Sequence, residues 1–329
     1  MNAPEPALIQ FLRNAGLATA GEEGEWTPLV GGVSSDIWRV SLTSGDVCVK
    51  RALSQLKVES DWTAPIDRNA HEWAYIECVA RIAPGHVPRP IVHDAEKGLF
   101  AMAWLAPEQF RLWKSELLAG RADARAAAAV GALLGRIHAA TAGDRDVADR
   151  FATDATFHAL RIEPYLLATA QRHPALAGEL EDIAATTASH RNVLVHGDVS
   201  PKNILLGDAG PVLLDAECAW FGDPAFDLAF CLNHLAIKAR VVTAARSALA
   251  DCFRQIMLTY FANVGWETVD ALERRAARLL PALALARVDG KSPVEYLDAA
   301  QRDVLRSAAV RAVKAGSTTL EQALHRLLA

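Results

Sequence analysis

Short runs of apolar and β-branched residues, separated by glycine and serine, fill the first third of the chain. Runs of this composition favour β-strands. We expect strands at residues 25–30, 36–42, 46–52, 87–94 and 98–105. Between the third and fourth runs, residues 66–82 predict a helix, with Asp67 as its N-cap and Pro84–Gly85 as its stop. The pattern therefore predicts a small sheet that carries one helix.

The pattern changes near Ala106, after which apolar residues recur at helical spacing. Four of them fall at i, i+3, i+4 and i+7 in the segment 122–141, namely Val130, Leu133, Leu134 and Ile137. Further helices are expected at 163–172, 176–190 and 224–240. The last of these is apolar almost all round, so we expect it to be buried. For the final helix we expect a capping box made by Thr318 and Glu321.

These elements predict an α+β fold with two lobes, a β-rich N-terminal lobe over residues 1–105 and a mainly helical C-terminal lobe over residues 106–329. The composition, 51% hydrophobic and 22% charged, is that of a globular protein with ample core. No apolar run approaches the roughly 20 residues that a membrane-spanning helix needs. The first residues also lack the features of a signal peptide. We therefore expect a cytoplasmic protein without a membrane partner.

Charge and cysteine content exclude two further classes. The net charge of -5, with no basic block, argues against nucleic acid as a partner. The five cysteines are odd in number and scattered without a C-x-x-C pair, so they predict free thiols rather than a disulfide or zinc framework. The sequence carries no signal for oligomeric state.

The stretch VLVHGDVSPKNILL, residues 193–206, places polar residues between two apolar runs. Val193–Val195 predicts a buried strand, which would project His196 and Asp198 onto a loop at its end. Asn203 follows five residues after Asp198 on the same loop. The arrangement indicates a catalytic or ligand-binding loop.

A second apolar strand, 212–214, ends in Asp215 and Glu217. We expect it to pair with 193–195 as a hairpin across the turn at Gly207–Gly210. Four side chains with hard oxygen atoms would then converge, those of Asp198, Asn203, Asp215 and Glu217. Carboxylates crowded in this way repel one another, and Mg²⁺, which prefers one or two carboxylates plus substrate phosphates, would relieve the cost.

A division of roles follows from this arrangement. One carboxylate must stay free of metal to accept a proton, and Asp198 is the candidate base. Asn203 and Asp215 are the candidate metal ligands, with Glu217 as a further metal ligand or a supporting carboxylate. His196 is expected to brace the backbone around Asp198 by hydrogen bonds. This set of groups is what phosphoryl transfer requires.

HGDVSPKN followed by LLDAE resembles the paired motifs of the aminoglycoside phosphotransferase and choline kinase family, which has a protein-kinase-like, bilobal fold. The resemblance runs in order over roughly residues 28–240. It implies ATP and Mg²⁺ as cofactors and a small-molecule hydroxyl as the phosphate acceptor. The stretch GDPAFDLA resembles the family segment whose aspartate, here Asp227, holds the backbone of the catalytic loop.

The N-terminal lobe carries matching segments. LVGGVSSDIWRV resembles the loop that covers the nucleotide, and VCVKR the strand with the phosphate-binding lysine, here Lys50. Glu72 falls where the family's helix glutamate pairs with that lysine, although Glu77 on the same helix competes with it. GLFAMAWLAPE resembles the hinge whose backbone holds the adenine. The implied nucleotide-binding residues are Gly31, Gly32, Ser34, Ser35, Met102, Ala103, Trp104 and Leu105.

Alternatives remain open at this stage. Within the family, the D-x-E ending and the stretches AWFGDPAFD and WKSELLAG resemble methylthioribose kinases. A nucleotide-binding pseudoenzyme is a second possibility. A third is a metal-dependent hydrolase built on His196, Asp198, Asp215 and Asp223.

The stretch LARVDGKSPVEYL carries three charged residues around a glycine, Arg287, Asp289 and Lys291. The simplest interpretation is a helix end with its glycine turn. The functional interpretation is an acceptor-binding loop, since the C-terminal helices of the family form the acceptor pocket. The two cations would then suit an acceptor with a carboxylate, a phosphate or many hydroxyls better than a polycationic aminoglycoside.

Overall fold

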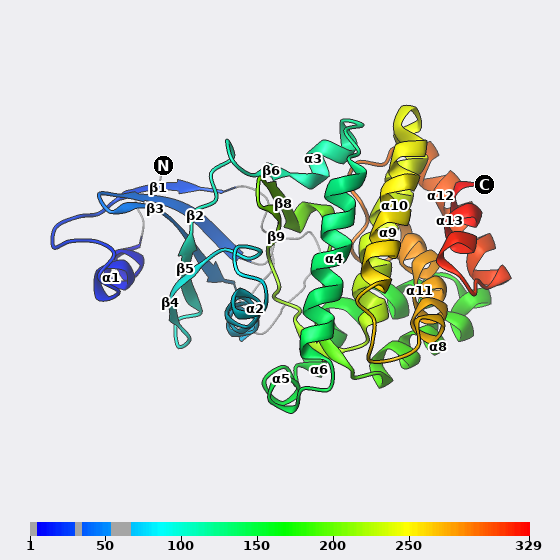
Figure 1. The fold of residues 1–329 in the computed structure, drawn as a ribbon, viewed down its shortest axis with the longest axis horizontal. Helices are drawn as coiled ribbons and strands as arrows, with labels where there is room; N and C mark the ends of the chain where they lie inside the picture. The colour runs from blue at the N-terminus through cyan, green and yellow to red at the C-terminus, as the bar shows by residue number, and fades with distance from the viewer. Residues whose placement is uncertain (1–4, 30–34, 54–66) are drawn as a thin grey trace.

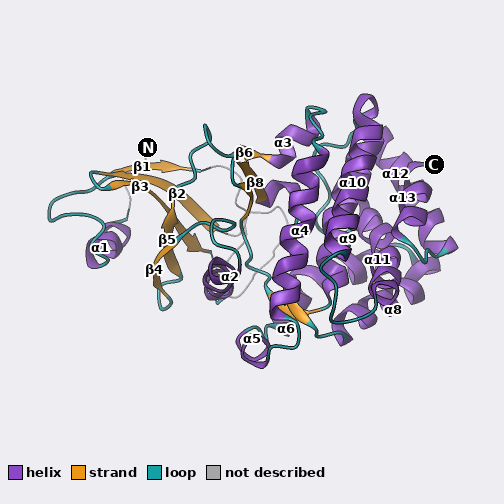
Figure 2. Cartoon of the chain, in the orientation of Figure 1, coloured by secondary structure: helices purple, strands orange, loops and turns teal. Residues whose placement is uncertain are grey.

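The computed structural model describes residues 5–29, 35–53 and 67–329. A sheet-containing part and a larger helical part lie side by side (Figure 1). The longer strands gather at one end of the molecule with α1 and α2, and the other helices lie at the opposite end together with the short strands (Figure 2). This arrangement confirms the α+β class.

The N-terminal part is built on a five-stranded antiparallel sheet in the order β1-β2-β3-β5-β4. Its strands are β1 (Glu25–Pro28), β2 (Ser35–Leu42), β3 (Gly45–Ala52), β4 (Pro90–Asp94) and β5 (Leu99–Ala103). Side chains alternate between the two faces of a strand. Val47 and Val49 of β3 therefore pack on one face, against the helix α1 (Pro6–Asn14), which the pattern analysis missed. Lys50 points to the opposite face.

The helix α2 (Arg68–Ile82) packs against that opposite face. It begins directly after Asp67, as expected, but the Asp67 side chain makes no capping hydrogen bond. The helix ends before Pro84 and Gly85, also as expected, and Gly85 adopts a positive φ of 84° that favours glycine. Glu72 on α2 thereby comes to lie opposite Lys50 on β3.

The C-terminal part consists mainly of helices, with three short 3₁₀ turns and five short strands. The helices are α3 (Trp113–Leu118), α4 (Ala124–Thr141), α5 (Arg145–Arg150), α6 (Asp154–Phe157), the π-helix η1 (His158–Leu167), α7 (Ala168–Arg172), α8 (Ala177–Ser189), α9 (Pro224–Val241), α10 (Arg246–Phe261), α11 (Val269–Asp289), α12 (Ala299–Ala315) and α13 (Leu320–Leu328). The 3₁₀ turns are η2 (Pro174–Leu176), η3 (Pro201–Asn203) and η4 (Thr243–Ala245). The strands are β6 (Arg111–Leu112), β7 (Val193–Val195), β8 (Ile204–Gly207), β9 (Gly210–Leu213) and β10 (Trp220–Gly222).

The predicted apolar faces form the helical core. All four stripe residues of α4 are buried, and α9 is buried over nearly its whole length. Glycines let α4 approach α10 closely, because a Cβ added at Gly131 would lie 2.5 Å from the carbonyl oxygen of Ile256. The α9 helix packs against both α10 and α11, and α4 packs against α10 (Figure 1).

The strand pairing around the catalytic loop differs from the expectation. A hairpin does span Gly207–Gly210, but its strands are β8 and β9. Val193–Val195 pairs instead with β10, antiparallel. The reason is that Ile204 and the residues after it form a further apolar run directly adjacent to the turn, and a two-residue connection favours pairing of the nearest strands. The catalytic loop therefore connects two small sheets.

Two helix predictions also need correction. The helix expected at 163–172 begins earlier, as the π-helix η1, and continues as α7. Pro164 has no N–H to donate within the helix, which accounts for the departure from α-helical bonding. The final helix is capped by Thr319 rather than Thr318, and the Thr319 hydroxyl accepts a hydrogen bond from the N–H of Gln322. Thr318 instead bonds the side chain of Gln322.

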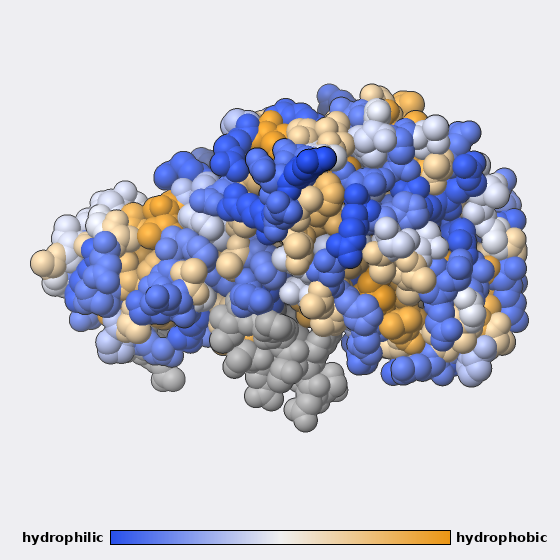
Figure 3. Space-filling view, turned by 90° about the horizontal axis from the view of Figure 1, so that it is seen from below, coloured by the Kyte–Doolittle hydropathy of each residue, from blue (hydrophilic) through white to orange (hydrophobic). Residues whose placement is uncertain are grey.

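Polar residues cover most of the face drawn in Figure 3, with apolar residues in separated groups. No single helix in the described parts of the chain is long and apolar enough to cross a membrane. The α9 helix and the segment 243–261 pass that test only as a pair, which is bent by 115°.

Candidate functional site

Lys50 joins the two parts of the molecule. Its Nζ lies 2.6 Å from Oε2 of Glu72 and 2.5 Å from Oδ1 of Asp215, which follows β9. Of the two candidate glutamates, Glu72 thus contacts the lysine, whereas Glu77 pairs with Arg150. Burial alone would lower the pKa of Lys50, but the carboxylates of Asp215 and Glu72 outweigh it and raise that pKa above its usual value. Burial raises the pKa of Glu72 to about 7 against the attraction of Lys50.

Asp227 on α9 fixes the backbone of the loop that carries Asp198. The Asp227 carboxylate accepts hydrogen bonds from the N–H groups of His196, at 2.7 Å, and Gly197, at 2.8 Å. Gly197 has a positive φ of 79°, and a Cβ there would lie 2.6 Å from the carbonyl oxygen of Cys218. Only glycine adopts this φ readily and has no Cβ to collide with Cys218, which accounts for the glycine between His196 and Asp198.

His196 bonds the backbone on both sides of the site. Its Nδ1 accepts from the N–H of Asp198 at 3.1 Å, and its Nε2 donates to the carbonyl oxygen of Leu214 at 3.1 Å. Burial lowers the pKa of His196 below its usual value, which is consistent with a neutral ring that donates on one side and accepts on the other. The histidine therefore links the catalytic loop to the strand end that carries Asp215.

Asp198 is buried between two cations. Its Oδ2 lies 3.0 Å from Nη2 of Arg161, on η1, and 3.2 Å from Nζ of Lys202. Burial alone would raise the pKa of Asp198, but the charges of Lys202 and Arg161 outweigh it and hold that pKa well below its usual range. The carboxylate is therefore ionised and oriented at neutral pH. Arg161 is a site residue that the motif analysis missed.

Asn203 and Asp215 lie on the two chain segments that flank Asp198. The Asn203 amide donates to the backbone oxygen of Asp198 at 3.1 Å, and the N–H of Leu214 donates to the backbone oxygen of Asn203 at 2.9 Å. Asp215 has a φ of 65°, a conformation that non-glycine residues rarely adopt. Lys50 and Lys202 lower the pKa of Asp215, whereas the nearby charge of Asp198 raises it. The two carboxylates therefore act on each other electrostatically.

The fourth expected oxygen ligand, Glu217, faces a buried arginine. Its Oε2 lies 3.2 Å from Nε of Arg68, the first residue of α2. Arg68 is only 1% exposed and also donates to the backbone oxygen of Leu53. No group of three or more His, Cys, Asp or Glu side chains in the described ranges is arranged to hold a metal. Any cation here would need ligand oxygens from elsewhere, such as phosphates.

Of the remaining residues expected to bind the nucleotide, five lie within the described ranges. Gly31, Gly32 and Ser34 lie outside the described residues. Ser35 begins β2 and is buried opposite Ala52. The hinge candidates Met102, Ala103, Trp104 and Leu105 are all partly buried at the end of β5 and directly after it. These residues connect the five-stranded sheet to the helical part.

The three residues proposed for an acceptor-binding loop have different partners and do not form one group. Arg287 is buried and donates to the hydroxyl of Tyr165. Asp289 pairs with Arg306 and His173, so it connects helices. Lys291 is half exposed and pairs with Glu163. Of the three, only Arg287 faces the interior near η1.

Asp223, the fourth member of the hydrolase alternative, lies elsewhere. It caps α9 and pairs with Arg275 at 3.0 Å. Because it does not join Asp198 and Asp215, a hydrolase centre of the proposed composition does not form.

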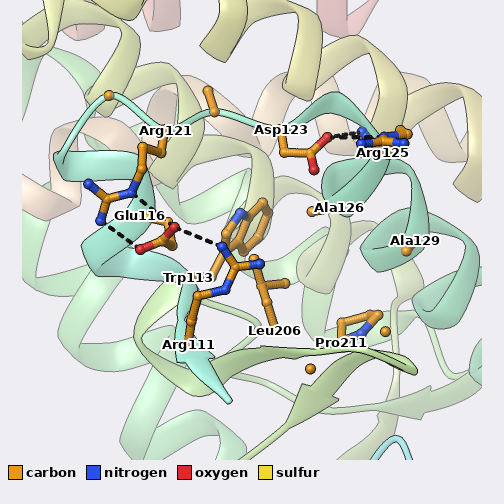
Figure 4. Close-up of a pocket in the computed structure, with 14 residues that line it drawn as sticks. Arg111, Trp113, Glu116, Arg121, Asp123, Arg125, Ala126, Ala129, Leu206 and Pro211 are labelled. Atoms are coloured by element: carbon orange, nitrogen blue, oxygen red, sulfur yellow. Dashed lines mark hydrogen bonds and ion pairs between the residues drawn. The ribbon is translucent and has the colours of Figure 1, made fainter. Parts of the chain in front are cut away.

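A cavity of about 620 Å³ lies on another side of the helical part (Figure 4). It is bounded by α3, the start of α4 and the β8–β9 hairpin, and Arg111 and Arg121 reach Glu116 at its edge. None of the site residues expected from the sequence lines it. The cavity is therefore separate from the candidate site formed by the buried ion pairs.

Two solved structures illustrate the proteins whose fold this chain resembles. An amicoumacin kinase, solved with AMP-PNP and Ca²⁺, superimposes with a TM-score of 0.61 at 13% identity and covers 94% of each chain. A choline/ethanolamine kinase family protein from Mesorhizobium loti superimposes with a TM-score of 0.56 at 17% identity, again over 94% of each chain. These likenesses confirm the protein-kinase-like, bilobal fold.

The chain belongs to the phosphotransferase enzyme family, whose profile matches residues 25–256. This confirms the family resemblance carried by the HGDVSPKN and LLDAE motifs. Among curated proteins, the methylthioribose kinase of Pectobacterium atrosepticum is 23% identical over 218 residues, which are 58% of this chain and 54% of that enzyme. The chain thus spans little more than half the length of the curated relatives that it matches.

Proposed function

We propose that this protein is an ATP- and Mg²⁺-dependent kinase that phosphorylates a hydroxyl group of a small molecule. The observation that carries the proposal is the pair of contacts that Lys50 makes with Glu72 and Asp215. A lysine from the sheet, held by a helix glutamate and reaching the carboxylate beside the catalytic loop, is the arrangement that phosphoryl transfer uses to hold a nucleotide. Membership of a phosphotransferase family supports the same conclusion.

In this proposal, Asp198 orients the acceptor hydroxyl and accepts its proton as phosphate transfers. Arg161 and Lys202 keep the carboxylate ionised, so it is a weak base that acts late, when the hydroxyl proton becomes acidic. Asp227 and His196 fix the loop so that the carboxylate does not reorient between turnovers. Most of the rate enhancement would come from position and electrostatics.

The donor set beside Asp198 fits Mg²⁺. Asn203 and Asp215 would hold the ion through one amide oxygen and one carboxylate, the small hard-oxygen set that Mg²⁺ accepts when phosphates supply further ligands. When bound, the ion would neutralise phosphate charge. Glu217 would support the site through Arg68 or as a further ligand. Asp215 would then exchange part of its contact with Lys50 for the metal.

The nucleotide would lie between the sheet and the helical part, which we propose to divide at residues 105 and 106. Lys50 would bind the α- and β-phosphates, the loop with Gly31, Gly32, Ser34 and Ser35 would cover them, and the backbone of Met102–Leu105 would hold the adenine. A relative of this fold was solved with AMP-PNP, and others with ADP or ATP.

The test is an Asp198→Asn variant assayed for ADP release with a panel of hydroxyl compounds. We expect the maximal rate to fall by about 10²–10⁴-fold, the range for removal of a general base. The thermal shift with Mg-ATP should persist, because Asp198 is not assigned to nucleotide binding. A variant with near-normal turnover would refute the catalytic role, and wild-type protein without any Mg-ATP shift would refute the kinase proposal.

Methylthioribose is the specific acceptor to test first. All four curated relatives that match are methylthioribose kinases, at 23–24% identity. ADP release with methylthioribose, above the rate with ATP alone, would establish that activity. ATP binding without ADP release for any acceptor would favour the pseudoenzyme alternative instead.

A further inference from the structure

Two buried cations near the catalytic loop lack a carboxylate partner. Lys238 on α9 is 1% exposed and Arg287 on α11 is 8% exposed. Across the described ranges, neither lies within ion-pair distance of an acid. Lys238 donates to the hydroxyl of Tyr296 at 3.3 Å, and Arg287 donates to the hydroxyl of Tyr165 at 3.0 Å and to Ser292. Neutral oxygens do not compensate buried charge, so this arrangement is costly without an anion.

The charges around Lys238 leave an excess of positive charge. Lys114 on α3 adds a third cation, and Glu295, an acid whose charge acts on Lys238, is already paired with Lys114. Burial, together with the charges of Lys114 and Arg287, lowers the pKa of Lys238 to about 7, and Glu295 opposes this shift only in part. The local field therefore favours binding of a negative charge.

Several polar atoms of the same region are buried without a hydrogen-bond partner among the described residues. They are Nε of Arg287, Nε2 of His234 and both amide atoms of Asn233. Buried polar atoms in native proteins are almost always paired. Burial lowers the pKa of His234 well below its usual value, and the charges of Lys238, Arg287 and Asp198 also act on that pKa, so these groups share one neighbourhood. Unpaired polar atoms beside uncompensated cations indicate a binding site for an anionic, hydrogen-bonding group.

A continuous row of side chains connects this cluster to Asp198. Phe230, His234 and Lys238 are spaced at i, i+4 and i+8 on α9, so they lie on one face of that helix. The Arg161 guanidinium, which contacts Asp198, lies 5.9 Å from the Phe230 ring centroid. Lys238 is two turns beyond Phe230, about 12 Å along the helix axis. The cations thus lie within reach of a small molecule whose hydroxyl is at Asp198.

We propose that the acceptor carries an anionic group, a carboxylate or a phosphate, which Lys238 and Arg287 bind while Asp198 contacts the reacting hydroxyl. This inference rests on the kinase proposal and narrows its substrate class. A polycationic acceptor would add charge to a region that already has an excess of cations. Methylthioribose, which is neutral, would leave both cations uncompensated.

The first test measures anion binding alone. The protein is saturated with Mg-AMP-PNP, so that its nucleotide site is filled, and its melting temperature is followed with inorganic phosphate or gluconate against sodium chloride at equal ionic strength. Wild-type protein should be stabilised by at least one of the two anions, because a ligand that binds only the native state raises the melting temperature. No such stabilisation in protein that binds Mg-AMP-PNP normally would overturn the inference.

The matched variants are Lys238→Met and Lys291→Met. Lys238→Met should abolish the anion effect, whereas Lys291→Met removes an exposed cation that is paired with Glu163 and should preserve it. Ligand-free Lys238→Met protein should melt at or above the wild-type temperature, because replacing an uncompensated buried charge by an apolar side chain of similar length is often stabilising. A Lys238→Met protein that keeps the anion effect would contradict the assignment.

The second test is ADP release with glucose, gluconate, glucose 6-phosphate, glucosamine and methylthioribose. Preference for gluconate identifies a carboxylate site and preference for glucose 6-phosphate a phosphate site, and kcat/KM for that acceptor should fall at least tenfold in Lys238→Met. Preference for a neutral or cationic acceptor overturns the inference while the kinase proposal stands. Loss of the Mg-ATP thermal shift in wild-type protein contradicts the kinase proposal itself, independently of the anion result.

Discussion

Most buried charged side chains at this site have a partner of opposite charge, and these partners determine the protonation state of each group. Asp198 has two cations, Arg161 and Lys202, and Lys50 has two acids. A carboxylate held in this way is ionised over the whole physiological range. By the same logic, Lys238 and Arg287, which have no acid partner in the described part of the chain, are candidates to bind an anionic ligand.

The pairing of Asp198 predicts how stability depends on pH. Its folded-state pKa is depressed below the unfolded value of about 4, so its stabilising contribution is present above that value and is lost as pH falls below it. In urea unfolding at pH 6, wild-type protein should therefore exceed Asp198→Asn in stability, and the difference should shrink steadily from pH 5 to pH 3. If the stability difference between the two proteins did not change with pH, Arg161 and Lys202 would not be stabilising an ionised Asp198.

At the scale of elements, hydrophobic periodicity predicted α4, α8 and α9 to within about two residues, because burial of one face or of the whole helix decides those segments. Hydrophobic periodicity missed α1. Its apolar residues Leu8, Phe11 and Leu12 pack on the sheet, and that contact cannot be read from the local sequence. The partner of Val193–Val195 was wrong for a related reason, since strand pairing is a tertiary property.

The contact between α4 and α10 supplies a prediction at this scale. Gly131→Ala should lower the free energy of unfolding by about 1–3 kcal/mol, because the new methyl would collide with the backbone of Ile256 in a packed interface. The matched control is Gly178→Ala in α8, where nothing lies within 4 Å of the added Cβ. That variant should be unchanged or more stable by up to about 1 kcal/mol, owing to the better helix propensity of alanine.

Chemical denaturation of the two variants separates packing from propensity. Equal stability changes in both would show that the α4–α10 approach tolerates a methyl group and that helix propensity decides the effect. A destabilised Gly131→Ala beside an unaffected Gly178→Ala would establish the close approach of these two helices as a determinant of the fold.

At the scale of the whole molecule, the candidate site is assembled from distant segments. Lys50 comes from β3, Glu72 from α2 and Asp215 from the end of β9, and their order along the chain made these residues predictable from motifs. Arg68 and Arg161 were not predictable in that way. Each lies far along the chain from the carboxylate that it contacts, and nothing in the local pattern distinguishes it from a surface arginine.

The ion pair between Lys50 and Asp215 joins the sheet to the helical part. Asp215 therefore contributes both to this contact and to the proposed nucleotide site. Asp215→Asn is the informative variant, because asparagine tolerates the φ of 65° far better than alanine and the backbone should be preserved. The variant loses both the charge opposite Lys50 and the proposed metal ligand. Its thermal shift with Mg-ATP should therefore fall well below that of wild-type protein, whereas the shift with ATP in EDTA should differ much less. Equal Mg-ATP shifts in the two proteins would contradict the metal assignment, since a ligand's stabilising effect follows its affinity directly.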